Sequence, residues 1–238
     1  MNKFLFYISK PIKNFFLKPA VRYKLFESYI FFPHPDELIF KYAFEFINHH
    51  GIEGDYLEFG VWKGRSFARA YNIWKYLFQA KGRLSEMRFF AFDSFQGLPE
   101  TSESSEFKRG QYFSTEKSFK KNIAAQDVDL LKVVTAPGWF EDTLNQETKN
   151  HFNLKKAAVI FVDCDLYESA KAVLDFLTDI IQDGAILIFD DWFVFKGHSD
   201  KGEQRAVKEW LKNNPQIHLI DWQNVNWRGK ALIVNIKK

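Results

Sequence analysis

Two pairs of aspartates in this sequence could hold a metal ion. Asp163 and Asp165 follow one apolar run of the chain, and Asp190 and Asp191 follow the next. Carboxylate oxygens are the ligands that hard divalent cations such as Mg²⁺ prefer, and carboxylates brought together without a cation repel each other. An aspartate after a strand often only turns the chain or caps a helix. Two successive pairs favour the metal site over that structural role.

The segments around these aspartates predict a parallel crossover unit. Residues 157–162 and 185–189 are short apolar runs rich in Val, Ile and Phe, which is typical of strands buried on both faces. Residues 168–181 have a helical pattern that we expect Asp183 and Gly184 to end. Parallel strands joined in this way present their carboxyl ends at one edge of the sheet, where open α/β sheets bind ligands.

The spacing of Asp163 and Asp165 predicts the directions of their side chains. If the strand continues past residue 162, Asp163 and Asp165 leave it on one face and Cys164 points to the other. We therefore expect both carboxylates to face the same site and Cys164 to pack in the core.

The rest of the chain continues the alternation of strands and helices. We expect helices at 35–50, 66–79, 117–126, 140–152 and 203–213, and further strands at 55–59, 88–92, 131–135, 217–221 and 231–236. The last two strands are predicted to pair antiparallel through a loop that contains Gly229. This order predicts an α/β fold with a mostly parallel, seven-stranded sheet and helices on both faces.

The first two predicted strands end in residues that suit a nucleoside ligand. The first strand leads through Gly60 and Gly64 into a helix, and these glycines allow a tight turn and a close approach of a ligand. Asp93 ends the second strand, where an acid accepts both ribose hydroxyls. Glu58 could accept a hydrogen bond from an amino group. These groups match S-adenosylmethionine, whereas NAD asks for a pyrophosphate cradle with a third glycine.

Five motifs carry a resemblance to a known family. They are residues 56–62, 93–99, 137–140, 163–169 and 190–192, and they extend over most of the chain. In sequence and order they are similar to the motifs of the macrocin O-methyltransferase-like family, which methylates sugars of antibiotics. The sequence departs from the family at Arg65 and Cys164, where the family usually has glycine. The resemblance implies a Rossmann-like class I methyltransferase fold with S-adenosyl-L-methionine and Mg²⁺ as cofactors.

The resemblance also implies roles for single residues. Asp163, Asp190 and Asp191 would be the metal ligands, and Asp165 would be the general base. The implied cofactor-binding residues are Glu58, Gly60, Gly64, Ser66, Asp93, Ser94, Gly138 and Trp139. The implied activity is O-methylation of a sugar hydroxyl in a glycoside or glycan, because a metal lowers the pKa of a hydroxyl that it coordinates.

Two other functions stay open at this point. A metal-dependent glycosyltransferase also uses an Asp-x-Asp motif after a strand, although the turn at 58–66 and Asp93 argue against it. A non-catalytic, membrane-associated scaffold with the methyltransferase fold would use the basic N-terminal segment, but it predicts that the aspartates of the metal site are lost.

The composition limits the class of protein. Hydrophobic residues make up 46% of the 238 residues and charged residues 26%, as in ordinary globular domains. A net charge of +3 is too small to indicate nucleic acid binding. Cys164 is the only cysteine, which excludes an intrachain disulfide and favours a reducing compartment. We expect a cytoplasmic enzyme, with the inner face of the membrane as an alternative place.

Residues 1–32 differ from the rest of the chain. They hold six basic residues against one acidic residue, with Phe and Tyr between them. We expect a helical arm that packs on its own domain or on the mate in a homo-oligomer, with contact to an anionic membrane as the alternative. Residues 33–238 are then a single methyltransferase domain, in which the Ser- and Thr-rich segment 98–114 is expected to be a lid or binding loop.

Overall fold

Seven strands form one sheet in the order β3-β2-β1-β4-β5-β7-β6. The computed structural model describes residues 35–78, 86–101 and 107–237, so the expected arm at 1–32 and part of the expected lid lie outside the described residues. The strands from β3 to β5 pair in parallel, whereas β7 pairs antiparallel with both β5 and β6. The strands are β1 (Asp55–Phe59), β2 (Phe89–Asp93), β3 (Val133–Pro137), β4 (Ala157–Val162), β5 (Ile181–Phe189), β6 (Ile217–Asn224) and β7 (Lys230–Ile236).

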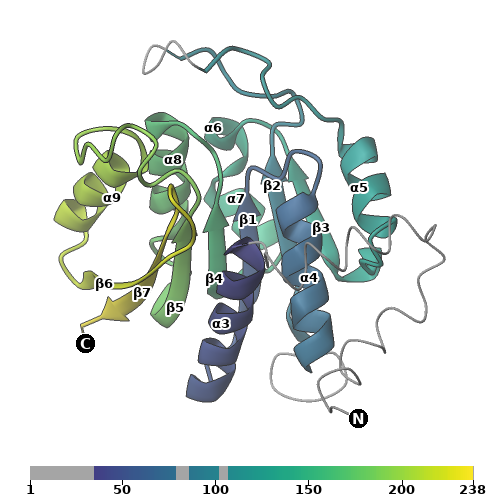
Figure 1. Cartoon of the computed structure of the whole chain (residues 1–238), viewed down its shortest axis with the longest axis horizontal. Helices are drawn as coiled ribbons and strands as arrows, with labels where there is room; N and C mark the ends of the chain where they lie inside the picture. Colours follow the sequence, from purple (N-terminus) through teal and green to yellow (C-terminus); the bar gives the residue numbers. More distant parts are fainter. Residues whose placement is uncertain (1–34, 79–85, 102–106, 238) are drawn as a thin grey trace. The chain divides into compact units, whose positions relative to one another are not determined.

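Helices cover both faces of this sheet (Figure 1). They are α3 (Pro35–His50), α4 (Arg65–Phe78), α5 (Glu116–Ala124), α6 (Phe140–Thr143), α7 (Gln146–His151), α8 (Tyr167–Leu177) and α9 (Gly202–Asn213), with a 3₁₀ turn η2 at Leu130–Lys132. The predicted α/β class, the seven strands and the closing antiparallel pair are confirmed. None of the described helices is long and apolar enough to cross a membrane.

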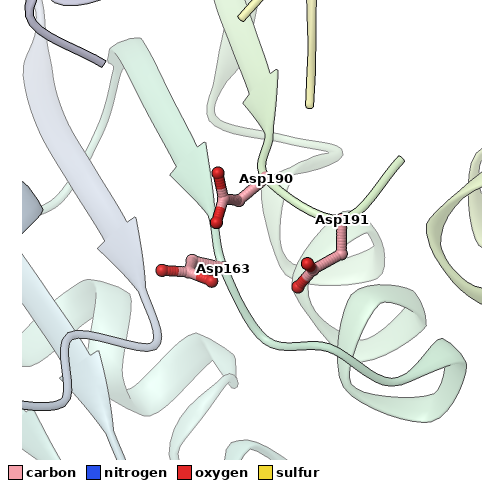
Figure 2. Close-up of side chains that lie close together, drawn as sticks. All are labelled: Asp163, Asp190 and Asp191. Carbon is pink, nitrogen blue, oxygen red and sulfur yellow. The ribbon is translucent and has the colours of Figure 1, made fainter. Parts of the chain in front are cut away.

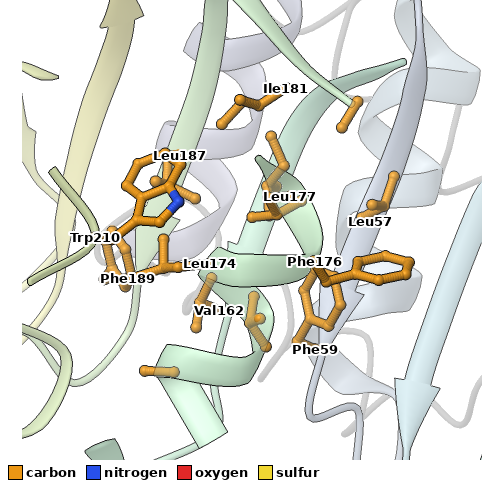
Figure 3. Close-up of a cluster of buried hydrophobic side chains, with 14 of the residues drawn as sticks. Leu57, Phe59, Val162, Leu174, Phe176, Leu177, Ile181, Leu187, Phe189 and Trp210 are labelled. Carbon is orange, nitrogen blue, oxygen red and sulfur yellow. The ribbon is translucent and has the colours of Figure 1, made fainter. Parts of the chain in front are cut away.

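Alternate side chains of the central strands build two separate cores. Tyr56 and Phe161 face α3 and α4, whereas Leu57, Phe59 and Val162 face α8 and α9 (Figure 3). All five side chains are buried. The continuous apolar runs in the sequence therefore arise because helices cover both faces of these strands.

Several predicted elements were wrong in their bounds. Strand β5 begins at Ile181 instead of residue 185, and β6 extends to Asn224 instead of residue 221. The helix expected over 168–181 ends at Leu177, and Ile181 already begins β5. Asp183 and Gly184 lie inside β5, where its pairing register with β4 shifts. The helix expected over 140–152 is two short helices, because the side chain of Asn145 accepts the N–H of Thr148 and begins α7 anew. The strand expected at 131–135 starts at Val133, after η2.

The parallel pairing sets the position of the candidate site. Phe59 lies opposite Phe92 on one side and Val162 on the other, and Val162 lies opposite Phe189. Strands β1, β2, β4 and β5 therefore end at the same edge of the sheet. The residues that follow these four ends are the ones that the sequence marks for chemistry.

Candidate active site

Three carboxylates meet beyond the ends of β4 and β5 (Figure 2). Asp163 follows β4 directly, and Asp190 and Asp191 follow β5. One carboxylate oxygen from each residue lies within 4.8 Å of the others. The two strand ends thus bring the aspartates together, as the crossover unit requires.

The chemistry of this cluster fits a divalent cation. All donors are carboxylate oxygens, which suit Mg²⁺ rather than a soft metal. Oδ2 of Asp191 is buried and has no hydrogen-bond partner among the described residues. Buried polar atoms normally have a partner, so this orphaned oxygen is available to a ligand.

Asp165 reaches the cluster by a different route from the expected one. Strand β4 ends at Val162, as the apolar run 157–162 predicts, and Asp165 has a φ of 60°, so strand alternation does not orient its side chain. A left-handed backbone is costly for a residue other than glycine and is often found at functional sites. Cys164 is buried in the core beside α8, in agreement with its expected packing role.

Burial and mutual repulsion raise the pKa values of these acids. Burial first, and then the charges of Asp190 and Asp191, raise the pKa of Asp163 well above its usual range. Burial and the charge of Asp191 raise the pKa of Asp165 to about 7, and burial and the charge of Asp190 raise the pKa of Asp191 to about 6. The metal-free cluster therefore holds protons near neutral pH.

Arg228, which the sequence did not single out, forms ion pairs with the cluster. Its guanidinium donates to Oδ1 of Asp191 at 2.7 Å and also contacts Oδ2 of Asp190. Burial alone would lower the pKa of Arg228, but the charges of Asp191 and Asp190 raise it. A lone arginine before a glycine in a hairpin loop gives no distinctive sequence signal.

Glu203 is a second unexpected member of the site. This residue of α9 is buried, and its Oε2 accepts the backbone N–H of Asp191 at 3.1 Å. Its Oε1 has no hydrogen-bond partner among the described residues. Burial and the charges of Asp191 and Asp190 raise its pKa well above the usual range. A glutamate on the same helix face as Ala206, Val207 and Trp210 was the available signal.

A cavity of about 290 Å³ extends from Asp163 and Asp165 to Asp93 at the end of β2. Among the residues expected to bind the cofactor, the cavity lining includes Gly60, Asp93, Ser94 and Trp139. From the acidic motif and the neighbouring loops it includes Asp163, Cys164, Asp165 and Arg228. The end of β2, where the sequence predicts the nucleoside, and the acidic motif therefore line one pocket.

Asp93 also has a structural role at this pocket. Its Oδ2 accepts the backbone N–H groups of Val61 and Trp62 at 2.8 and 2.9 Å, and its Oδ1 accepts that of Phe95 at 2.7 Å. The carboxylate thus orders the loop between β1 and α4. A carboxylate has about four acceptor positions, so capacity remains for a ligand.

The other expected cofactor residues do not line the cavity. The carboxylate of Glu58 is buried and accepts the hydroxyls of Tyr56 and Ser66, the latter at 2.6 Å. The N–H of Gly138 donates to the carbonyl oxygen of Asp93 at 3.0 Å. Ser66 and Glu58 therefore fix the first turn of α4, and Gly138 fixes the end of β3 beside β2.

Two glycines of the β1–α4 turn are required by close packing. Gly60 has a φ of 86°, and a Cβ atom there would lie 1.8 Å from the carbonyl oxygen of Asp163. Gly64 has a φ of 81°, and its Cβ would lie 2.4 Å from Cγ2 of Ile123. Gly60 lets β1 pass beside the first acidic residue, so the turn and the carboxylate cluster depend on each other.

Aromatic side chains lie at the rim of the cavity. Trp62 is 43% exposed, lines the cavity and meets Tyr112 edge to face, with 5.7 Å between the ring centroids. The indole N–H of Trp62 donates to the carbonyl oxygen of Phe113 at 3.3 Å. The side chain of His198 is 61% exposed, its Nδ1 lies 4.0 Å from Oδ1 of Asp200, and His198 is not part of the cavity lining.

The comparison with known families fits this arrangement. Residues 39–229 match the model of the family described as macrocin-O-methyltransferase (TylF). The chain belongs to this family. It is therefore an O-methyltransferase, and the resemblance stated from the sequence motifs is confirmed.

Individual relatives agree with the family assignment. The chain is 31% identical to 8-demethyl-8-(2,3-dimethoxy-alpha-L-rhamnosyl)-tetracenomycin-C 4'-O-methyltransferase of Streptomyces olivaceus, over 80% of this chain and 72% of that protein. It is 27% identical to mycinamicin III 3''-O-methyltransferase of Micromonospora griseorubida, over 76% and 70% of the two chains. The structure of the O-methyltransferase NovP has a similar fold, with a TM-score of 0.67 and 22% identity over 85% of this chain and 80% of that one.

Proposed function

We propose that this enzyme transfers a methyl group from S-adenosyl-L-methionine to a sugar hydroxyl, with Mg²⁺ held by Asp163, Asp190 and Asp191. One observation carries the proposal. A cluster of three carboxylates suited to a divalent cation lies beside the same cavity as Asp93 at the end of β2. A class I methyltransferase that activates a hydroxyl needs both groups within reach of each other.

The cofactor would lie along the edge formed by the ends of β1 and β2. Asp93 would accept the ribose hydroxyls with its remaining acceptor capacity, while Gly60 and Ser94 line the floor and Trp139 packs on the base. Glu58, Ser66, Gly64 and Gly138 would support this surface from behind. When bound, S-adenosylmethionine supplies a methyl group on a sulfonium that is ready for in-line displacement.

Asp165 would accept the proton that leaves the acceptor hydroxyl. It lines the cavity next to the cluster, so its carboxylate is placed to take a proton from a hydroxyl held there. When bound, Mg²⁺ lowers the pKa of a coordinated hydroxyl. Only Asp163, Asp190 and Asp191 are needed as ligands, because acceptor oxygens and water complete an oxygen shell.

The rim suits a carbohydrate acceptor. Trp62 and Tyr112 are each 43% exposed and line the same cavity as Asp163, and such side chains combine an apolar surface with a polar group. One relative is named for a rhamnosyl group of tetracenomycin. We therefore propose a deoxysugar glycoside as the acceptor class. The glycosyltransferase and scaffold alternatives are not favoured, because the chain belongs to a methyltransferase family.

The test is methyl transfer to a panel of rhamnosides, measured with labelled S-adenosylmethionine. EDTA should abolish transfer and Mg²⁺ should restore it. Asp190→Asn should lose transfer by at least about a hundredfold, the scale seen when one group that stabilises transition-state charge is removed. Asp175→Asn is the matched control, because Asp175 pairs with Lys171 on the exposed face of α8. Full transfer by the Asp190→Asn variant in EDTA would show that the carboxylates are structural.

A further inference from the structure

We propose that Arg228 is an internal counter-ion that binds Asp190 and Asp191 in the metal-free enzyme and must leave them when a divalent cation binds. This inference rests on the proposed metal site. It assigns to Arg228 a role in setting the affinity of that site and in keeping the empty site folded.

The contacts place the guanidinium between the cavity and two of the three proposed ligands. The side chains of Asp190 and Asp191 are only 6% and 2% exposed, and neither residue lines the cavity. The side chain of Arg228 is 35% exposed and does line the cavity. A cation that enters from the cavity therefore meets Arg228 before it meets these two carboxylates.

The backbone that carries Arg228 is fixed, so a change has to come from its side chain. The carbonyl oxygen of Arg228 accepts the N–H of Phe193 at 2.8 Å, and its own N–H donates to Oδ1 of Asn226 at 2.7 Å. A Cβ atom at Gly229 would lie 2.9 Å from the carbonyl oxygen of Phe189. The β6–β7 loop is thus held closely against the end of β5, with the arginine side chain directed at the cluster.

A guanidinium and a divalent cation compete for the same oxygens. Oδ1 of Asp191 and Oδ2 of Asp190 are both used by Arg228, and Oδ2 of Asp191 is the oxygen that has no partner. A bound Mg²⁺ would repel a guanidinium at contact distance from its own ligands. Metal binding therefore includes the loss of these ion pairs, which weakens the observed affinity.

The experiment measures Mg²⁺ binding directly by calorimetry at pH 8, without methyl donor or acceptor. Arg228→Met should bind Mg²⁺ about tenfold to a hundredfold more tightly than the wild type, because one or two charge-assisted hydrogen bonds no longer compete. Arg228→Lys, which keeps one charge without the planar fork, should lie between them. Arg65→Met is the matched control, since Arg65 lines the same cavity and forms no ion pair with a described residue.

Thermal melting in EDTA supplies the second measurement. The Arg228→Met protein should melt several degrees below the wild type, because its buried carboxylates lose their cation, and Mg²⁺ should raise its melting temperature more than that of the wild type. Unchanged melting in EDTA would overturn the stabilising role of Arg228. If the wild type binds Mg²⁺ and Arg228→Met binds it with equal or lower affinity, the competition is overturned and the metal site remains. The absence of binding in both proteins would overturn the metal site itself.

Discussion

Replacement of Asp93 tests whether one carboxylate both orders the cofactor loop and binds the cofactor. In the structure it accepts three backbone N–H groups, from Val61, Trp62 and Phe95, at 2.7 to 2.9 Å. Asp93→Ala leaves all three donors without this acceptor. We therefore expect the variant to lose stability even when no ligand is present.

The expected magnitude follows from these three bonds. Hydrogen bonds to a charged group contribute about 1.5–3 kcal/mol each when buried, and water replaces part of this at a half-buried site. Three bonds that are lost together from one loop should then cost about 2–4 kcal/mol, because the donors regain water and the losses are not additive. Asp93→Asn keeps one carbonyl oxygen but turns its amide N–H₂ toward a backbone donor, so it should cost about half as much.

Urea unfolding without ligand and calorimetry with S-adenosylhomocysteine separate the two roles. If Asp93 both orders the loop and binds the cofactor, Asp93→Ala loses stability in the absence of ligand and also binds S-adenosylhomocysteine at least about tenfold more weakly. A free energy of unfolding within about 0.5 kcal/mol of the wild type would refute the structural role. Unchanged affinity for S-adenosylhomocysteine would refute the proposed ribose contact.

Two further predictions concern the acids of the cluster. Asp165→Asn should leave Mg²⁺ and S-adenosylhomocysteine binding nearly intact in calorimetry. It should lower turnover by about 10²–10⁴, the usual contribution of a general base. Loss of Mg²⁺ binding in this variant would make Asp165 a metal ligand instead. Because the folded-state pKa values of Asp165 and Asp191 are raised to about 7 and about 6, the metal-free enzyme should lose up to a few kcal/mol of stability between pH 4 and pH 7. Urea unfolding in EDTA measures the free energy of unfolding across this pH range, and a rise from pH 4 to pH 7 would contradict the prediction. Mg²⁺ should reduce the loss of stability.

Patterns that recur along the chain predicted the fold, whereas breaks in those patterns caused the errors. The apolar runs of β4 and of residues 185–189 in β5 predicted buried strands because helices cover both faces of the sheet. The end of α8 was missed because the apolar pattern continues from Leu177 into Ile180 and Ile181, which belong to the following turn and strand. Hydrophobic periodicity gives the type of an element better than its last residue.

The carboxylates were predictable as a group, and their surroundings were not. Each aspartate follows a strand, so sequence order alone brings Asp163 and Asp190 to one edge of the sheet. The contacts of Arg228 depend on how a distant hairpin loop packs against β5, and no local pattern encodes that contact. The hydrogen bonds of Asp93 to the β1–α4 loop also join residues about thirty positions apart.

The density of acids at this site supports the proposed cation. Asp163, Asp165, Asp190, Asp191 and Glu203 lie close enough for their charges to raise one another's pKa values. Several buried carboxylates cannot all be ionised unless positive charge compensates them. Arg228 supplies one such charge, so without further positive charge part of the group must hold protons. The proposed Mg²⁺ would supply that charge. Mg²⁺ binding should therefore release protons, and the number released should fall as the pH is raised above 7.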